Sequence, residues 1–144
     1  MRDVVVSSDG FLKQQVAAGS HSFVADEPVE AGGGDLGPDP YSLLLAALGA
    51  CTSMTLQLYA RHKGIPLEGV RVRLRHNRIH ATDCSECEST EGTVSRIERH
   101  ISLTGQLTDA QKQRLMEIAG RCPVNKTLTS EIVVADFLDG PAGV

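Results

Sequence analysis

The chain has 144 residues, of which 41% are hydrophobic, and its 18 acidic and 14 basic side chains give a net charge of −4. This length fits one domain that buries a core of its own. Three Phe, two Tyr and no Trp leave few rings on which bases could stack, and an acidic chain does not attract phosphate backbones, so we expect no nucleic-acid partner.

The N-terminal residues predict no targeting segment. MRDVVVSSDGFLKQQ lacks the apolar run of a signal peptide, and no stretch approaches the roughly 20 apolar residues needed to span a bilayer. We therefore expect a cytoplasmic protein with no membrane contact. Thiols are kept reduced in that compartment, so we expect the four cysteines to be reactive, metal-bound or buried rather than a permanent disulfide framework.

Residues 1–38 predict short strands followed by a connector. Three β-like segments are separated by an Asp-Gly and a Gly-Ser turn signal. They are residues 3–8, 11–19 and 21–27. The glycines of EAGGGDLGPDP are not followed by the Lys-Ser/Thr ending of a phosphate loop. We therefore expect a flexible connector at that point.

Residues 39–62 predict a long and very apolar central helix. Asp39 caps the free N–H groups, Pro40 favours the first turn, and Gly64 stops the helix. Residues that recur at three- and four-residue spacing share one face, which we expect to point inward. They are Leu44, Ala47, Leu48, Cys51, Met54, Thr55 and Leu58.

The opposite side of this helix is apolar too, and a helix that is apolar all round is normally covered on every side. The sheet of so small a chain covers only one side. Small residues at positions 46, 47, 49 and 50 let another helix backbone approach closely. The pattern therefore predicts a symmetric homodimer in which the same helix of a second subunit packs here.

Residues 70–137 predict a strand, a strand, a helix and a strand, in that order. In GVRVRLRHNRIH apolar residues alternate with Arg, which indicates a strand with one solvated basic face, and residues 92–105 form its antiparallel partner. Thr108 and Gln111 make a capping box for a helix that ends at Gly120. EIVVADF, residues 131–137, predicts the final strand, and we expect residues 138–144 to be a loose tail.

The connector between the two middle strands contains a C-x-x-C. Cys84 and Cys87 could bind zinc with His80 and a carboxylate, but His76 and His80 would lie about 13 Å apart on an extended strand, too far to share one ion. A reversible dithiol and a plain surface connector are the other interpretations. We expect no metal and no cofactor.

The other two cysteines lie in different settings. Cys122 precedes Pro123 and so lies at the N-terminus of a new helix, where free N–H groups favour a thiolate. A small capping residue is the alternative interpretation. For Cys51, alone on an apolar helix face, a buried small hydrophobe is the favoured interpretation.

The segments GPDPYSLLLAALGACTSMTL and RCPVNKTL together resemble the paired-cysteine signature of the OsmC/Ohr family of osmotically inducible and organic-hydroperoxide-resistance proteins. The likeness extends over nearly the whole chain. It implies an α+β fold in an obligate, intertwined homodimer, with antiparallel sheets around two long central helices. It also implies a thiol peroxidase that reduces organic hydroperoxides to alcohols. In that reaction Cys51 attacks the peroxide, Cys122 resolves the sulfenic acid, and an external dithiol restores both thiols.

One position departs from the family pattern. In the family's peroxidases a Glu ten residues before the first Cys holds an Arg from the N-terminal strands against the thiolate, whereas this chain has Tyr41 there and no Arg in the matching loop. A buried thiol without a cationic neighbour reacts slowly. Lys13, Arg121 and Lys126 are the candidate substitutes for the missing charge.

Two further function classes remain open. The first is a non-catalytic protein that binds a small hydrophobic ligand in the apolar interface pocket. The second is a metal-binding or redox-sensing protein that uses Cys84 and Cys87.

Overall fold

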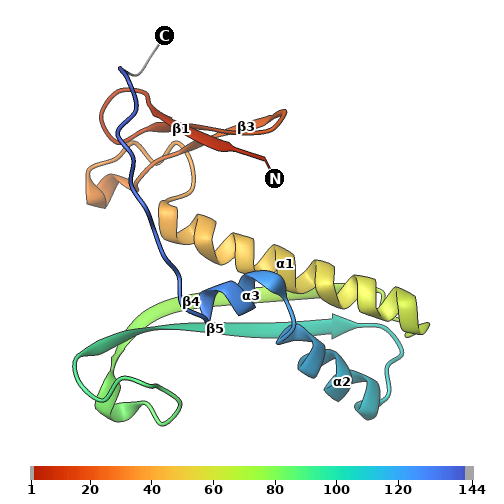
Figure 1. Cartoon of the computed structure of the whole chain (residues 1–144). Coiled ribbons are helices and arrows are strands. Elements are labelled where there is room, and N and C mark those ends of the chain that lie inside the picture. Colours follow the sequence, from red (N-terminus) through yellow and green to blue (C-terminus); the bar gives the residue numbers. More distant parts are fainter. Residues whose placement is uncertain (1, 142–144) are drawn as a thin grey trace.

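The computed structural model describes residues 2–141, and its N-terminal part is a three-stranded sheet (Figure 1). Strands β1 (Val4–Ser8), β2 (Gln14–Ala18) and β3 (His21–Ala25) form an antiparallel meander in the order β1-β2-β3. Glycines with positive φ, Gly10 and Gly19, lie in the two turns. The three predicted strands are confirmed.

The glycine-rich connector that follows is more ordered than the sequence indicates. It contains a 3-10 turn, η1 (Val29–Ala31), and folds around the buried carboxylate of Asp26. That carboxylate accepts the backbone N–H groups of Glu27 (2.8 Å), Gly34 (3.1 Å) and Leu36 (3.3 Å). The prediction of a flexible connector was wrong because it did not include the Asp26 carboxylate. This carboxylate accepts backbone N–H groups that would otherwise have to hydrogen-bond to water.

A long hairpin and three helices make up the rest of the chain. Strands β4 (Gly69–His80) and β5 (Thr93–Thr104) pair antiparallel over twelve residues, joined by a connector that contains η2 (Ala81–Asp83). The helices are α1 (Pro40–Lys63), α2 (Asp109–Ala119) and α3 (Pro123–Leu128). The fold is therefore α+β with antiparallel sheets, as expected.

The predicted helix signals are confirmed. Asp39 accepts the N–H of Ser42 at the start of α1, and Gly64 ends that helix in the left-handed conformation. The Thr108 and Gln111 capping box is present in α2. Figure 1 shows α1 lying along one face of the β4–β5 hairpin, with the N-terminal sheet beyond the first turn of that helix.

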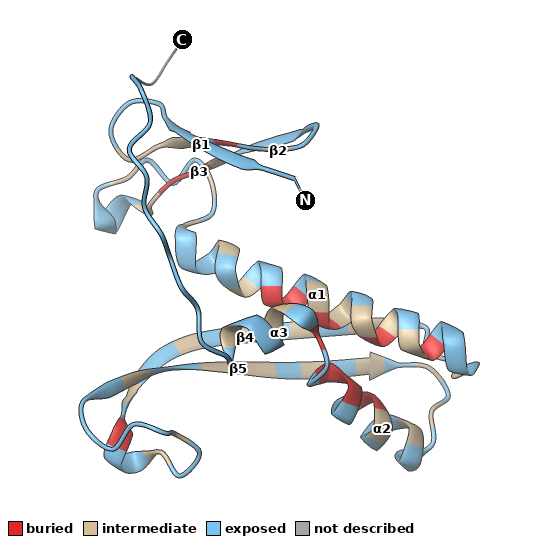
Figure 2. Ribbon diagram, viewed as in Figure 1, coloured by how far each residue is buried: buried red, intermediate tan, exposed pale blue. Residues whose placement is uncertain are grey.

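The core lies where α1 and α2 meet on the hairpin (Figure 2). Leu56 and Leu115 are fully buried at its centre, and half-buried strand residues such as Val70, Ile101 and Leu103 pack against them. The arginines at positions 71, 73 and 75 point to solvent on the other face of β4. The hairpin therefore has one apolar and one basic face, as its alternation predicts.

The predicted inward face of α1 is wrong by part of a turn. The chain buries Leu48, Gly49, Thr52, Leu56 and Ala60, whereas four residues of the predicted face, Leu44, Ala47, Met54 and Leu58, are exposed. Cys51 is half-buried. On a helix that is apolar all round, periodicity does not choose the packed side. Gly49 decides it here, because a Cβ at that position would meet the side chain of Leu74 on β4 at 2.7 Å.

The predicted final strand is also wrong for the single chain. Residues 131–137 are extended and exposed but pair with no strand within residues 2–141, and Figure 1 shows them running from α3 towards the N-terminal sheet. An apolar, β-prone segment forms a strand only where an edge is available to pair with it. Residues 142–144 of the predicted tail lie outside the described residues.

The prediction that no stretch is long and apolar enough to span a bilayer is wrong for helix α1. By length and composition alone it is long and apolar enough to cross a bilayer, which the sequence analysis did not anticipate. The core helix of a soluble protein meets the same criterion, and α1 supplies much of the core described above.

Candidate active site

The structure brings Cys51 and Cys122 together, although they lie 71 positions apart in the sequence. Cys51 lies in the middle of α1, and Cys122 is the residue from which α3 begins. The Cys51 thiol hydrogen-bonds to the sulfur of Cys122. Both thiols are free; that of Cys122 is fully buried and that of Cys51 half-buried. A small molecule therefore reaches Cys51 first.

The surroundings of Cys122 favour its thiolate. Burial raises the pKa of Cys122, but hydrogen bonding from the Cys51 thiol and from the N–H groups of Asn125 and Val124 outweighs that effect. The net result is that the pKa of Cys122 lies below its ordinary value. The two N–H groups belong to the first turn of α3, so the predicted helix-terminus setting of Cys122 is confirmed.

A charged residue that the sequence analysis missed lies beside these thiols. Arg99 on β5 donates from Nη1 to Thr52 Oγ1 (3.1 Å) and to the carbonyl oxygen of Ala119 (3.0 Å). Thr52 in turn donates to the carbonyl oxygen of Leu48 (2.7 Å). Arg99 therefore ties the residue that follows Cys51 to the end of α2, three residues before Cys122.

The sequence contained a signal for Arg99. Along β5 the odd positions Ile97, Ile101 and Leu103 face the helices, and Arg99 occupies the same face. A cation in an apolar alternation requires partners inside the fold. The three candidates named from the sequence are placed differently: Lys13 pairs with Asp9 at 2.9 Å in the N-terminal sheet, and Arg121 and Lys126 are exposed.

Tyr41 lies apart from the two thiols within this chain. It is ten residues before Cys51, about 15 Å along the helix. Its ring stacks on that of His76, with centroids 4.7 Å apart and planes 11° from parallel. The two rings line an open groove of about 570 Å³ with Leu45, Leu74 and Glu98. At the position where the family pattern has a Glu that holds an arginine, this chain has Tyr41, which stacks on His76 instead.

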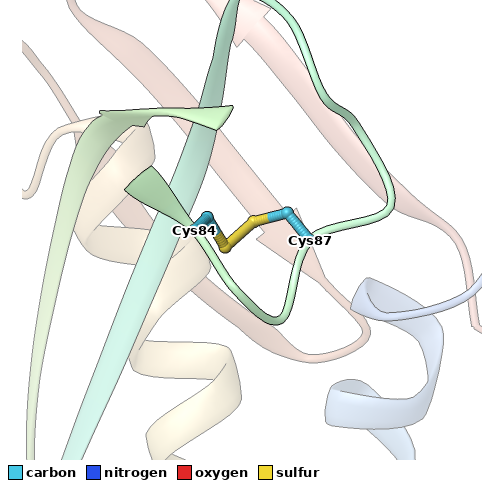
Figure 3. The surroundings of a disulfide bond; sticks show 2 residues. All are labelled: Cys84 and Cys87. Carbon is cyan, nitrogen blue, oxygen red and sulfur yellow. A yellow bond between two sulfur atoms is a disulfide. The ribbon is translucent and has the colours of Figure 1, made fainter. Parts of the chain in front are cut away.

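Cys84 and Cys87 form a disulfide in the connector between β4 and β5 (Figure 3). Their Cα atoms are 5.5 Å apart, and both residues are half-buried. Among residues 2–141 no group of three or more His, Cys, Asp or Glu side chains is placed to hold a metal ion. In this state the two sulfurs are bonded to each other, which contradicts the zinc interpretation and agrees with the reversible dithiol.

Comparisons with known proteins identify the fold. The sequence profile described as OsmC-like protein matches residues 32–135. No curated protein sequence matches the chain. The chain is similar in structure to a Psychrobacter arcticus protein described as an osmotic stress induced and detoxification response protein, with a TM-score of 0.70, 19% identity and 88% of each chain covered.

Two further solved structures share this fold. The organic hydroperoxide resistance protein OsmC of Legionella pneumophila matches with a TM-score of 0.63 and 21% identity, over 88% of this chain and 89% of that one. The organic hydroperoxide resistance protein OhrB of Bacillus subtilis matches with a TM-score of 0.61 and 19% identity, over 90% of each chain. Since the family profile spans both cysteine segments and most of the chain, the chain belongs to the OsmC-like protein family.

Proposed function

We propose that the protein is a thiol-dependent peroxidase that reduces organic hydroperoxides to alcohols with Cys51 and Cys122. The observation that carries this proposal is that the fold brings Cys51, in the middle of α1, next to Cys122, from which α3 begins. Structural relatives named as organic hydroperoxide resistance proteins support the choice of substrate.

The arrangement suggests how the reaction begins. Cys122 is the thiol whose pKa is lowered, yet Cys51 is the more accessible sulfur. As Cys51 attacks the terminal peroxide oxygen, its proton passes along the hydrogen bond to the Cys122 thiolate. The O–O bond breaks, the leaving alkoxide takes that proton from Cys122 and departs as the alcohol, and Cys51 becomes a sulfenic acid while Cys122 is again a thiolate.

The second step forms the disulfide between the two cysteines. Cys122, already in contact with Cys51, attacks the sulfenic acid sulfur, and water leaves as the Cys51–Cys122 disulfide forms. An external dithiol then reduces that disulfide. Such reductants are maintained in the cytoplasm, where we place the protein.

We further propose that the protein works as a homodimer. Three apolar surfaces of the single chain have no partner within residues 2–141. They lie on the N-terminal sheet, on α1 and on residues 131–138, and Figure 2 shows these parts mostly in the exposed colour. Their most exposed members are Val4, Val5, Val6, Met54, Leu58, Val133, Val134, Phe137 and Leu138. Apolar surface of this extent is typical of an interface.

Rapid mixing of the reduced protein with cumene hydroperoxide or hydrogen peroxide, followed by mass mapping of the cysteines, tests the peroxidase. We expect fast loss of the organic peroxide and a Cys51–Cys122 disulfide. Cys51→Ser should consume none, and Cys122→Ser should stop at a sulfenic acid that dimedone traps. Ser53→Ala on the same helix is the matched control. Intact thiols with no peroxide loss would leave the hydrophobic-ligand function in its place.

A further inference from the structure

The Cys84–Cys87 disulfide does not hold the fold together. The hairpin is already closed beside it, because the N–H of Ala81 donates to the carbonyl oxygen of Gly92 at 2.9 Å. A disulfide between residues three apart closes only a small ring, so it restrains the unfolded chain little. The bond can therefore break and form again without loss of the surrounding structure.

The segment that carries the two sulfurs, residues 81–92, is called the C-x-x-C loop below, and Figure 3 shows the disulfide within it. Residues 85–91 make no backbone–backbone hydrogen bond within residues 2–141, so none has to break when the sulfurs separate. Both cysteines are half-buried and line a hollow of about 360 Å³. A small molecule can reach the sulfurs through this hollow.

The C-x-x-C loop is strongly acidic. It contains four carboxylates and no Lys or Arg, so its formal charge equals the net charge of the whole chain, −4. All four side chains are exposed, and none forms an ion pair within residues 2–141. They are Asp83, Glu86, Glu88 and Glu91. The loop therefore presents unneutralised negative charge beside the disulfide.

Two of these carboxylates flank Cys87. Glu86 lines the same hollow as the sulfurs, and Glu88 lines a neighbouring hollow. Arg96 also lines the first hollow, but its guanidinium pairs with Glu98 at 3.3 Å, so its charge is offset. A thiol that carries a positive charge is therefore attracted to this disulfide, and an anionic thiol is repelled.

We propose that the Cys84–Cys87 disulfide is a second redox site, which exchanges with small thiols that carry a positive charge. The site acts independently of the proposed peroxidase. Gly92, where the C-x-x-C loop ends, lies seven residues before Arg99 of the thiol site, which is about 23 Å along β5. This distance keeps the two pairs of cysteines apart.

The exchange takes place in two steps. The thiolate of one small thiol attacks the sulfur of Cys87, the disulfide breaks, and Cys84 leaves as a thiolate. Cys84 is the better leaving group because it has one adjacent carboxylate, that of Asp83, whereas Cys87 lies between two. A second small thiol then attacks the sulfur of the first and releases Cys87.

Atoms and electrons balance over these steps. Two small thiols are oxidised to one small disulfide, and the bond between Cys84 and Cys87 is reduced by the same two electrons. The two protons of the small thiols end on the two cysteines. The reverse reaction, with a small cationic disulfide as the oxidant, restores the bond present in the structure.

Reduction of the loop disulfide by two small thiols of opposite charge tests the proposal. The probes are cysteamine, which is positive, and 3-mercaptopropionate, which is negative. The full chain with Cys51→Ser/Cys122→Ser removes the other two thiols, and acid quenching followed by mass mapping gives the rate of reduction. The measured quantity is the ratio of the cysteamine rate to the 3-mercaptopropionate rate.

Neutralising the carboxylates beside Cys87 isolates the effect of charge. We expect Glu86→Gln/Glu88→Gln to lower this ratio about tenfold at low ionic strength. The intrinsic reactivity of each probe cancels in this comparison. The difference should shrink strongly at 1 M salt, where the Debye length is about 3 Å. Glu27→Gln/Glu30→Gln, which removes two carboxylates from another acidic segment, is the matched control and should leave the ratio unchanged.

Two outcomes overturn the proposal. The same ratio with and without the carboxylates at positions 86 and 88 means that they do not select the thiol. A disulfide that neither probe reduces until the chain is unfolded in urea means that the bond is not a redox site. The wild-type chain, in which mass mapping follows Cys84 and Cys87 separately, should give the same ratio as the double Ser variant, so the test does not depend on the folding of that variant.

Early quenching identifies the attacked sulfur. When the reaction with cysteamine is stopped with acid within the first turnover and then alkylated with N-ethylmaleimide, Cys87 should carry cysteamine and Cys84 should carry the maleimide. The opposite labelling would overturn the argument from the adjacent carboxylates.

Discussion

Two leucines of α1, two positions apart, lie on different faces of that helix. One belongs to the core of the single chain and the other to its proposed dimer face. Leu56 is fully buried beside Leu115 and Ile118, whereas Leu58 is 65% exposed. Leu56→Ala leaves a cavity that the helices cannot fill, so we expect it to lower the free energy of unfolding by about 2 to 5 kcal/mol. In an isolated chain Leu58→Ala should cost about 0.5 to 1 kcal/mol, a third of the value for full burial.

A dimer changes the expected cost of Leu58→Ala. If a second subunit covers Leu58, the cost of Leu58→Ala rises towards that of Leu56→Ala, and the unfolding midpoint of the wild type increases with chain concentration. Urea denaturation followed by far-UV circular dichroism at two chain concentrations measures both effects. A cost below about 1 kcal/mol for Leu56→Ala would refute the core described above. A small cost for Leu58→Ala, with a midpoint independent of concentration, would refute the dimer face.

Three further predictions concern the connector and the thiol site. Burial alone would raise the pKa of Asp26, but three backbone N–H groups lower it below 3.8. The ionised carboxylate therefore contributes its full stabilisation above pH 3.8, and this stabilisation is lost as the pH falls through the lowered pKa. Asp26→Asn should therefore lower the melting temperature most above about pH 4 and less at lower pH, whereas Asp35→Asn, in the same loop, should have little effect at either pH. Thr52→Val removes the acceptor of one hydrogen bond from Arg99, so it should lower the free energy of unfolding by about 1 to 3 kcal/mol in urea denaturation; unchanged stability would contradict this contact. Arg99→Met should lower the free energy of unfolding by about 1 to 3 kcal/mol, because two hydrogen bonds from a charged donor are lost. It should also slow peroxide consumption about tenfold, and Arg99→Lys should recover part of the rate. Wild-type kinetics in Arg99→Met would refute the positioning role of Arg99.

The secondary structure was largely predictable because its signals are local. Asp39 and Gly64 bound α1 as expected, the Thr108 capping box starts α2, and the alternation of arginines in β4 sets the exposed face of the hairpin. Each of these signals depends on residues within one or two turns of one another. Local hydrogen bonding and the two periodicities of helix and strand are enough to place them.

The thiol site was only partly predictable. The two cysteines were picked out by their segments and by the family resemblance, and the structure brings them into contact. Arg99 was missed, although it breaks an apolar alternation, because its partners Thr52 and Ala119 lie 47 and 20 positions away. A cation inside a fold is recognised by partners that only the tertiary structure brings near.

By itself, the sequence determined where the helices and most of the strands lie, because caps, turns and periodicity are properties of neighbouring residues. Only the tertiary structure decided which side of α1 is buried, because an all-apolar helix packs through the side that allows the closest approach, here at Gly49. It also left residues 131–137 unpaired, since a strand requires an edge and the single chain offers that segment none. Packing and pairing are relations between distant segments, and a pattern within one segment does not specify them.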